Sequence, residues 1–177
     1  DPDLAEAHLG VAVYRMYYEW DFEGAEEAFQ RALEINPSLV SAHYHLAWLY
    51  ELYGKDEEAL RLGELTKELD PLSPFYSGWL AEQYRDADMF DEAIKEANET
   101  LKLRRGYAVG LLVLGEPYTD LGEFDKAIDE FKKVIEFGTK YSQLPNAKGL
   151  ASSARKDIIP VYALKGNPAK AYDFFRP

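Results

Sequence analysis

The stretch AEEAFQRALEINPSLVSAHYHLAWLYELYG, residues 25–54, belongs to a pattern that returns at a fixed interval along the chain. Three tyrosines keep this interval (84−50 = 118−84 = 34), namely Tyr50, Tyr84 and Tyr118. Four alanines keep it as well, namely Ala25, Ala59, Ala93 and Ala127. A fixed period of this length is typical of a chain built from stacked copies of one structural unit.

Each copy contains two predicted helices. Apolar residues recur at intervals of three and four, as on one face of a helix, rather than alternating as in a strand. Leu46, Ala47 and Tyr50 share one such face, and Gly54 separates it from the next helix. One helix pair cannot bury its apolar face alone, so it stacks on the next pair. The helices are expected at residues 4–18, 22–35, 40–53, 56–69, 74–86, 90–103, 107–120, 124–136, about 147–165 and 168–175.

Two copies depart from the regular interval. Tyr162 follows Tyr118 at a longer interval (162−118 = 44), and the difference from the regular one (44−34 = 10) implies an insertion in the last copy. We place this insertion at about residues 138–149 and interpret it as the one long connection outside the repeats. Its neighbourhood is basic, which indicates a solvated face or, as the alternative, a site for a phosphate or an acidic partner. The first copy carries one extra residue, because the interval from His8 to His43 is longer by one (43−8 = 35).

These residues resemble the tetratricopeptide repeat family, whose pattern is W-x2-L-G-x2-Y, then A-x3-F, then P. The matching positions are Leu46, Ala47, Tyr50, Ala59 and Pro71 in one copy, and Leu114, Gly115, Tyr118, Ala127 and Phe131 in another. The resemblance implies an all-α fold, an α-α superhelix (a tetratricopeptide repeat solenoid) of antiparallel helix pairs. It also implies that the first helices line a concave groove that binds proteins or peptides.

The resemblance predicts a single solenoid domain over residues 1–177. Its units are expected at residues 6–39, 40–73, 74–107 and 108–139, followed by the insertion and a partial fifth unit at about 150–177. Gly63 and Ala97 replace the phenylalanine of the pattern, so we expect thinner packing there. The first unit, with Trp20-Asp21-Phe22 in its turn, is more weakly similar to repeat arrays of bacterial multidomain regulatory proteins.

Composition and charge exclude several classes of site and partner. The chain has 177 residues and no cysteine, which excludes disulfides, thiolate metal sites and cysteine nucleophiles. Residues 1–100 carry 7 Lys+Arg and 23 Asp+Glu, a net charge of −16, whereas residues 101–177 carry 13 and 9, a net charge of +4. The acidic half repels phosphate backbones, so nucleic acid is not an expected partner. A basic protein or peptide is the expected partner of this half. No apolar run approaches the roughly 18 residues of a membrane span, so no membrane association is expected.

No catalytic, metal or cofactor site is predicted. His43 and His45 lie two residues apart on a helix, where side chains diverge, so they cannot chelate a metal together, and we predict that they pack. Acidic pairs recur at the first turn of the second helices, where they complement the helix dipole. These pairs are Glu26-Glu27, Glu57-Glu58 and Asp91-Glu92. A catalytic pair would not be repeated in every unit, so we predict that the chain is not an enzyme.

Repeat position predicts which side chains line the groove. The peptide-groove candidates are Tyr14, Tyr17, Tyr44, Trp48, Phe75, Glu82, Arg85, Leu112 and Glu116. Aromatic side chains give large contact area with little conformational entropy to lose. Tyr44 and Trp48 could instead cover the core; as a groove residue, Trp48 could be truncated with little loss of stability. Pro117 and Pro160 fall inside helices and face the groove by the same phasing, either reshaping its wall or without functional meaning.

The predicted function is a non-enzymatic protein–protein interaction scaffold that binds a basic or apolar peptide or protein segment in an aromatic and acidic concave groove. One alternative is a self-associating structural module, a homo-oligomer formed through open solenoid ends, because Phe174 and Phe175 have no capping helix in the sequence. Another alternative is the regulatory sensor region of a larger multidomain signalling protein. We interpret the chain, which begins with Asp1 rather than Met, as a fragment and expect a cytoplasmic location.

Overall fold

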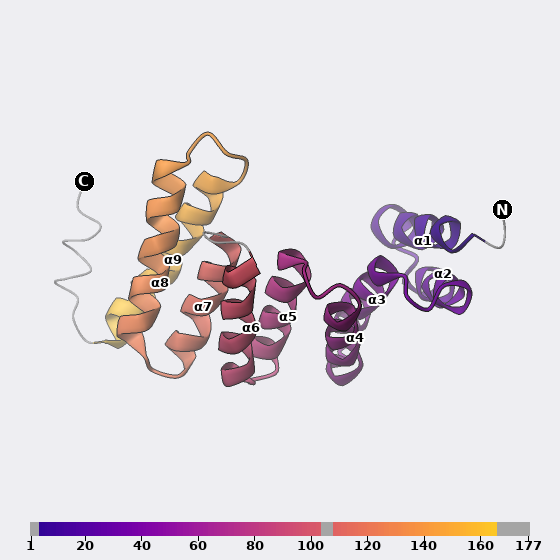
Figure 1. Cartoon of the computed structure of the whole chain (residues 1–177), viewed down its shortest axis with the longest axis horizontal. Helices are drawn as coiled ribbons and strands as arrows, with labels where there is room; N and C mark the ends of the chain where they lie inside the picture. The colour runs from indigo at the N-terminus through magenta and orange to yellow at the C-terminus, as the bar shows by residue number, and fades with distance from the viewer. Residues whose placement is uncertain (1–3, 104–107, 166–177) are drawn as a thin grey trace. The chain divides into compact units, whose positions relative to one another are not determined.

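The computed structural model describes residues 4–103 and 108–165, and the side chains of all these residues except 108–113. All regular elements in these ranges are helical, with no strand among them, so the predicted all-α class is confirmed. The elements are α1 (Ala5–Tyr14), the π-helical turn η1 (Arg15–Glu19), α2 (Phe22–Ile35), α3 (Val40–Leu52), α4 (Asp56–Leu69), α5 (Pro74–Asp86), α6 (Phe90–Leu103), α7 (Ala108–Asp120), α8 (Phe124–Lys140) and α9 (Ala147–Leu164) (Figure 1). The predicted helix at 168–175, with Phe174 and Phe175, lies outside the described residues, as does the side chain of Leu112.

The chain divides into two compact units. The N-terminal unit is Asp1–Leu72 and the C-terminal unit is Ser73–Pro177. This division falls one residue before the boundary expected between the second and third repeats, at residues 73 and 74. The finer division into five repeats within one domain stays a prediction.

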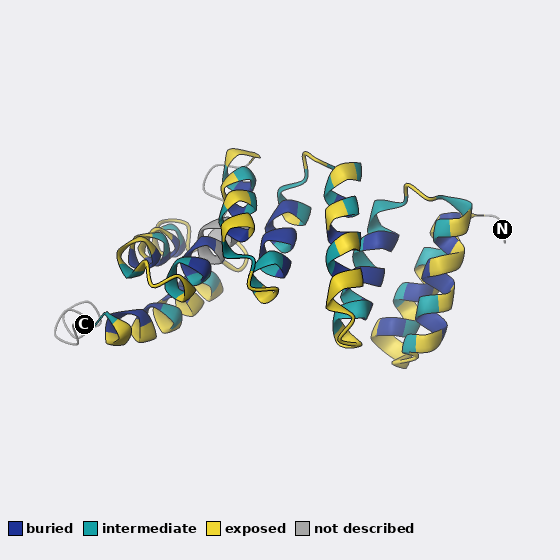
Figure 2. Cartoon of the chain, turned by 90° about the horizontal axis from the view of Figure 1, so that it is seen from below, coloured by how far each residue is buried: buried dark blue, intermediate teal, exposed yellow. Residues whose placement is uncertain are grey.

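In the N-terminal unit, each helix packs against the next, from α1 to α4. Phe29 is fully buried at the centre of its core, and Ala25 and Ala32 on the same helix are fully buried beside it. Because alanine has a short side chain, neighbouring helix axes can approach closely at these positions. The helices accordingly carry a buried stripe on one side and an exposed stripe on the other (Figure 2).

In the C-terminal unit, each helix likewise packs against the next, from α5 to α9. Phe131 on α8 is 1% exposed and occupies the repeat position of Phe29. The Phe131 ring leaves no space for a side chain at position 115 of α7, because a Cβ atom on Gly115 would lie 2.6 Å from the ring. Gly115 is therefore required by packing.

The turns inside three helix pairs share one backbone feature. Gly54, Asp88 and Gly122 keep the interval of the repeat (88−54 = 122−88 = 34), and their φ angles are 68°, 59° and 73°. Glycine adopts this left-handed conformation without steric cost, and aspartate tolerates it better than most other residues. The repeat therefore fixes the turn geometry as well as the helices.

The extra residue of the first copy is accommodated in η1. The predicted helix at 4–18 ends as an α-helix at Tyr14 and continues as the π-helical turn. The N–H of Asp21 donates to the carbonyl oxygen of Arg15 at 3.0 Å, and Trp20 between them has a φ angle of 57°. A π-helical turn holds one more residue than an α-helical turn, which accounts for the longer interval in the first copy.

The insertion is not the long connection that the sequence predicted. Helix α8 continues to Lys140 rather than ending at 136, and α9 begins at Ala147, so only residues 141–146 connect them. The two helices touch at Gly138, where a Cβ atom would lie 2.3 Å from the Cβ of Ala151 and 2.5 Å from the carbonyl oxygen of Ala147. Part of the insertion thus lengthens α8, and Gly138 lets the backbones of α8 and α9 approach closely.

Candidate functional site

Six ring-bearing side chains of α1, η1 and α3 form what we call the aromatic cluster. It consists of Tyr14, Tyr17, Tyr18, Tyr44, His45 and Trp48. Tyr17 stacks on Trp48, with ring centroids 5.5 Å apart and planes at 22°. Tyr14 stacks on Tyr18 at the same centroid distance, with planes at 18°. Both stacked pairs draw tyrosines from one helical segment, residues 14–18, and Trp48 of α3 completes the pair with Tyr17.

The cluster is anchored to the core of the N-terminal unit. His45 stacks on the fully buried Phe29, with centroids 5.8 Å apart and planes at 14°. It also meets Tyr44 and Tyr17 at centroid distances of 5.0 and 5.9 Å. Trp48 is half-buried and packs against the same core. The expectation that Trp48 could be truncated with little loss of stability is therefore replaced by a dual role, in which it covers the core and supports Tyr17.

Burial favours the uncharged forms of Tyr17 and His45. Desolvation raises the pKa of Tyr17 and lowers the pKa of His45, and both shifts favour the neutral side chain at pH 7. The Tyr17 hydroxyl oxygen lies 3.5 Å from Nδ1 of His45. The cluster therefore offers a neutral surface for apolar or aromatic contacts.

The outer face of the cluster is open to solvent. Tyr14, Tyr17 and Tyr18 are 54%, 42% and 75% exposed. Exposed apolar groups that lie together, unlike scattered ones, mark interaction surfaces. Tyr18 was not among the predicted residues, because uninterrupted helix phasing places it beside the groove. The extra residue in the first copy was the signal that this phasing changes within residues 15–19.

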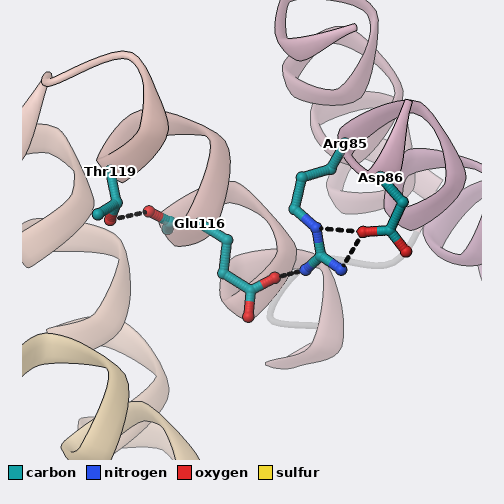
Figure 3. A network of polar contacts seen from close by, with 5 residues as sticks. Arg85, Asp86, Glu116 and Thr119 are labelled. Atoms are coloured by element: carbon teal, nitrogen blue, oxygen red, sulfur yellow. Dashed lines mark hydrogen bonds and ion pairs between the residues drawn. The ribbon is translucent and has the colours of Figure 1, made fainter. Parts of the chain in front are cut away.

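The C-terminal unit holds a cavity of about 310 Å³ that we call the charged cavity. Its lining residues come from α5, α7, α8 and α9 and are Arg85, Glu116, Thr119, Asp120, Phe131, Asp157 and Pro160. Nε of Arg85 donates to Asp86 at 2.9 Å, and Nη1 of Arg85 forms an ion pair with Glu116 (Figure 3). Arg85 and Glu116 were both predicted site residues, and the structure brings them into contact.

Two further carboxylates, those of Asp120 and Asp157, line the charged cavity. Among the side chains that the structure describes, those of residues 4–103 and 114–165, none forms an ion pair or hydrogen bond with the carboxylate of Asp120 or Asp157. Burial raises the pKa of Asp157, although the nearby positive charge of Lys156 partly offsets this. Sequence analysis missed both residues, because their meeting depends on how α7 packs against α9.

The prolines inside helices lie in different environments. Pro160 is exposed and lines the charged cavity. Pro117 is fully buried, so the prediction that it faces a groove is wrong. A one-residue difference in phase along α7 is enough to turn a side chain from a helix surface into the core.

Phe75, Glu82 and His43 belong to neither the aromatic cluster nor the charged cavity. Phe75 is 49% exposed and meets Tyr76 edge-on, and Glu82 is half-buried, but neither lines the charged cavity. Nε2–H of the buried His43 donates to the carbonyl oxygen of Pro37 at 2.8 Å, which is a structural role.

Among the described residues, no group of three or more His, Asp or Glu side chains is placed to hold a metal ion. None of the described helices has the length and apolar character needed to cross a membrane.

The chain matches family models of one repeat and is similar in fold to several solved structures. Models of the tetratricopeptide repeat match residues 28–61 and 110–137. A crystal structure of MamA protein is similar with a TM-score of 0.78 and 23% identity, over 97% of this chain and 88% of that one. MamA from residue 41 to its end, from Desulfovibrio magneticus RS-1, has a TM-score of 0.78 and 13% identity, over 97% and 90%. YrrB, described as a tetratricopeptide repeat protein with an unusual peptide-binding site, has a TM-score of 0.72 and 19% identity, over 97% and 82%. The predicted fold class, a solenoid of antiparallel helix pairs, is confirmed.

Proposed function

Since this chain is a tetratricopeptide repeat protein, we propose that it is a non-enzymatic interaction module that binds a protein or peptide segment on its aromatic cluster. The observation that carries the proposal is the combination of exposure and anchoring in Tyr17. This residue is 42% exposed, yet its ring is held by stacking on Trp48. A ring held in place before binding loses little conformational entropy when a partner arrives.

The neighbouring tyrosines extend this contact surface. Tyr14 and Tyr18 stack on each other and expose 54% and 75% of their surface. Tyrosine and tryptophan are enriched among the residues that dominate binding energy at interfaces, because they bury large apolar areas. The hydroxyl groups of the exposed tyrosines can in addition donate hydrogen bonds to the backbone of a bound segment.

The charge of the N-terminal unit favours a basic partner. Residues 1–72 contain 5 Lys+Arg and 16 Asp+Glu, a net charge of −11 (5−16). Such a field attracts cationic segments and repels anionic ones, and salt screens it over about 10 Å at 0.1 M ionic strength. The expected ligand therefore combines apolar or aromatic side chains with flanking lysines or arginines.

The comparisons support a peptide-like ligand. YrrB, which is similar to this chain in fold, is described as having a peptide-binding site. Stacked helical repeats form extended surfaces that suit elongated ligands. We therefore propose a linear segment rather than a small molecule as the partner.

A peptide array screened with the whole chain tests the proposal. Peptides that combine aromatic or aliphatic residues with lysine or arginine should be retained, and retention should weaken as salt is raised from about 0.05 M to about 0.5 M. An array of the same peptides with lysine and arginine replaced by glutamate serves as the control and should be retained least. Retention of no peptide, or preferential retention of the glutamate array, would contradict the proposed function.

A further inference from the structure

We propose that the charged cavity of the C-terminal unit binds the side chain of a lysine or arginine from a partner protein. The inference rests on the proposed function only in taking the partner to be a protein, since the aromatic cluster belongs to the other unit. A volume of about 310 Å³ is at the lower end of the roughly 300–1,000 Å³ typical of ligand pockets. This space suits one long side chain.

The charges that line the cavity do not cancel. Glu116, Asp120 and Asp157 supply three negative charges and Arg85 one positive charge, so the lining sums to −2 (1−3). Arg85 is already engaged, because its guanidinium contacts both Asp86 and Glu116. Its positive charge is therefore committed, and the deficit is located at Asp120 and Asp157.

Asp157 is a carboxylate that an added cation would stabilise. It is half-buried on α9, and burial disfavours its charged form, as the raised pKa shows. An ammonium or guanidinium group beside it would replace the water that burial has removed. Asp120 at the end of α7 lines the same cavity and offers a second acceptor.

The other walls fit the rest of a basic side chain. Phe131 and Pro160 are apolar, and long basic side chains bury their methylene groups along such surfaces while the charged head forms hydrogen bonds. The hydroxyl of Thr119 donates to the carbonyl oxygen of Gly115 at 2.8 Å, so its oxygen remains able to accept a bond from the ligand.

Two other classes of ligand fit less well. An anion would face three carboxylates, and the one lining cation is already paired. A metal ion normally needs several ligands of fixed geometry, and no cluster of three such side chains occurs in the described part of the chain. A monovalent organic cation carried on an aliphatic chain matches both the charge and the walls.

Amide chemical-shift mapping on the whole chain tests the inference. The probes are acetyl-Gly-Gly-X-Gly-Gly-amide peptides in which X is lysine, arginine or norleucine. Lysine or arginine peptides should cause saturable shifts in residues 116–120 and 155–160, and the norleucine peptide should not. Equal shifts with norleucine, or no shifts in these residues with any peptide, would overturn the inference.

The double variant Asp120→Asn/Asp157→Asn provides the specific test. It should weaken binding of the lysine peptide by about fivefold or more, as expected for two partly exposed charge pairs. A control that changes the net charge equally, Asp91→Asn/Asp129→Asn, alters exposed carboxylates that do not line the cavity and should leave affinity unchanged. Equal affinity of the two double variants would refute the role of the cavity. If the array retains no peptide but the mapping shows binding, only the proposed function is refuted. If the array retains peptides but the mapping shows no shifts in the cavity residues, only the inference about the charged cavity is refuted.

Discussion

The ring of Tyr17 in η1 stacks on the ring of Trp48 in α3, with centroids 5.5 Å apart and planes at 22°. This contact joins the π-helical turn that holds the extra residue of the first repeat to the first helix of the second repeat. It makes Trp48 both a support for an exposed ring and a cover for the core. Stability and binding are therefore expected to depend on the same tryptophan.

Replacing Trp48 by alanine should lower the free energy of unfolding by about 2 kcal/mol, because a half-buried indole packed on the core is lost. Urea denaturation followed by circular dichroism measures this change. Tyr18→Ala is the matched control, since its ring is 75% exposed, and it should change stability by less than about 0.5 kcal/mol. Equal stabilities of the two variants would show that Trp48 contributes no core packing.

Replacing Gly138 by alanine should destabilise the C-terminal unit by about 2 kcal/mol, because the added Cβ meets the carbonyl oxygen of Ala147 and the Cβ of Ala151. Thermal and urea unfolding both report this change. The control is Gly149→Ala on α9, where a Cβ would meet nothing within 4 Å and helix propensity should add about 0.5 kcal/mol. If Gly138→Ala is as stable as Gly149→Ala, α8 and α9 do not approach as closely as described.

His45 should make stability depend on pH. Its pKa is lowered in the folded state by burial, so the unfolded chain binds protons more readily. The free energy of unfolding should therefore fall as the pH drops below the ordinary histidine pKa of about 6.5. His45→Phe keeps a ring against Phe29 and removes the titration, so its loss of stability between about pH 7.5 and about pH 5.5 should be smaller than in the wild type. An equal or larger loss in the variant would contradict the burial of a neutral His45.

The helices could be predicted from the sequence, because the signals that form them are local. Leu46, Ala47 and Tyr50 predicted the face of α3, and Gly54 predicted its end, within one or two residues of the structure. The regular interval of the repeat extended the same reasoning to the other pairs. The extra residue in the first copy was visible as well, but a spacing does not reveal that it is held as a π-helical turn.

The candidate site was predicted less completely, because it depends on contacts between helices. Arg85 and Glu116 were both predicted as site residues, but their ion pair was not predicted. Asp157 comes from α9, whose register against α7 depends on an insertion that breaks the period. Gly138 shows the same limit, because the close approach of α8 and α9 at this residue is a tertiary effect.

The most direct test of the central claim is the dissociation constant of the tightest array peptide, measured by calorimetry for wild type and for Tyr14→Ser/Tyr18→Ser. Both rings are exposed, so the variant should stay folded, and its affinity should fall by about tenfold or more if the aromatic cluster is the binding surface. Tyr53→Ser is the control, because Tyr53 is an exposed tyrosine of the same unit that contacts Lys55 and lies outside the cluster. Affinity of the double variant equal to that of wild type, or an equal loss in Tyr53→Ser, would contradict the account.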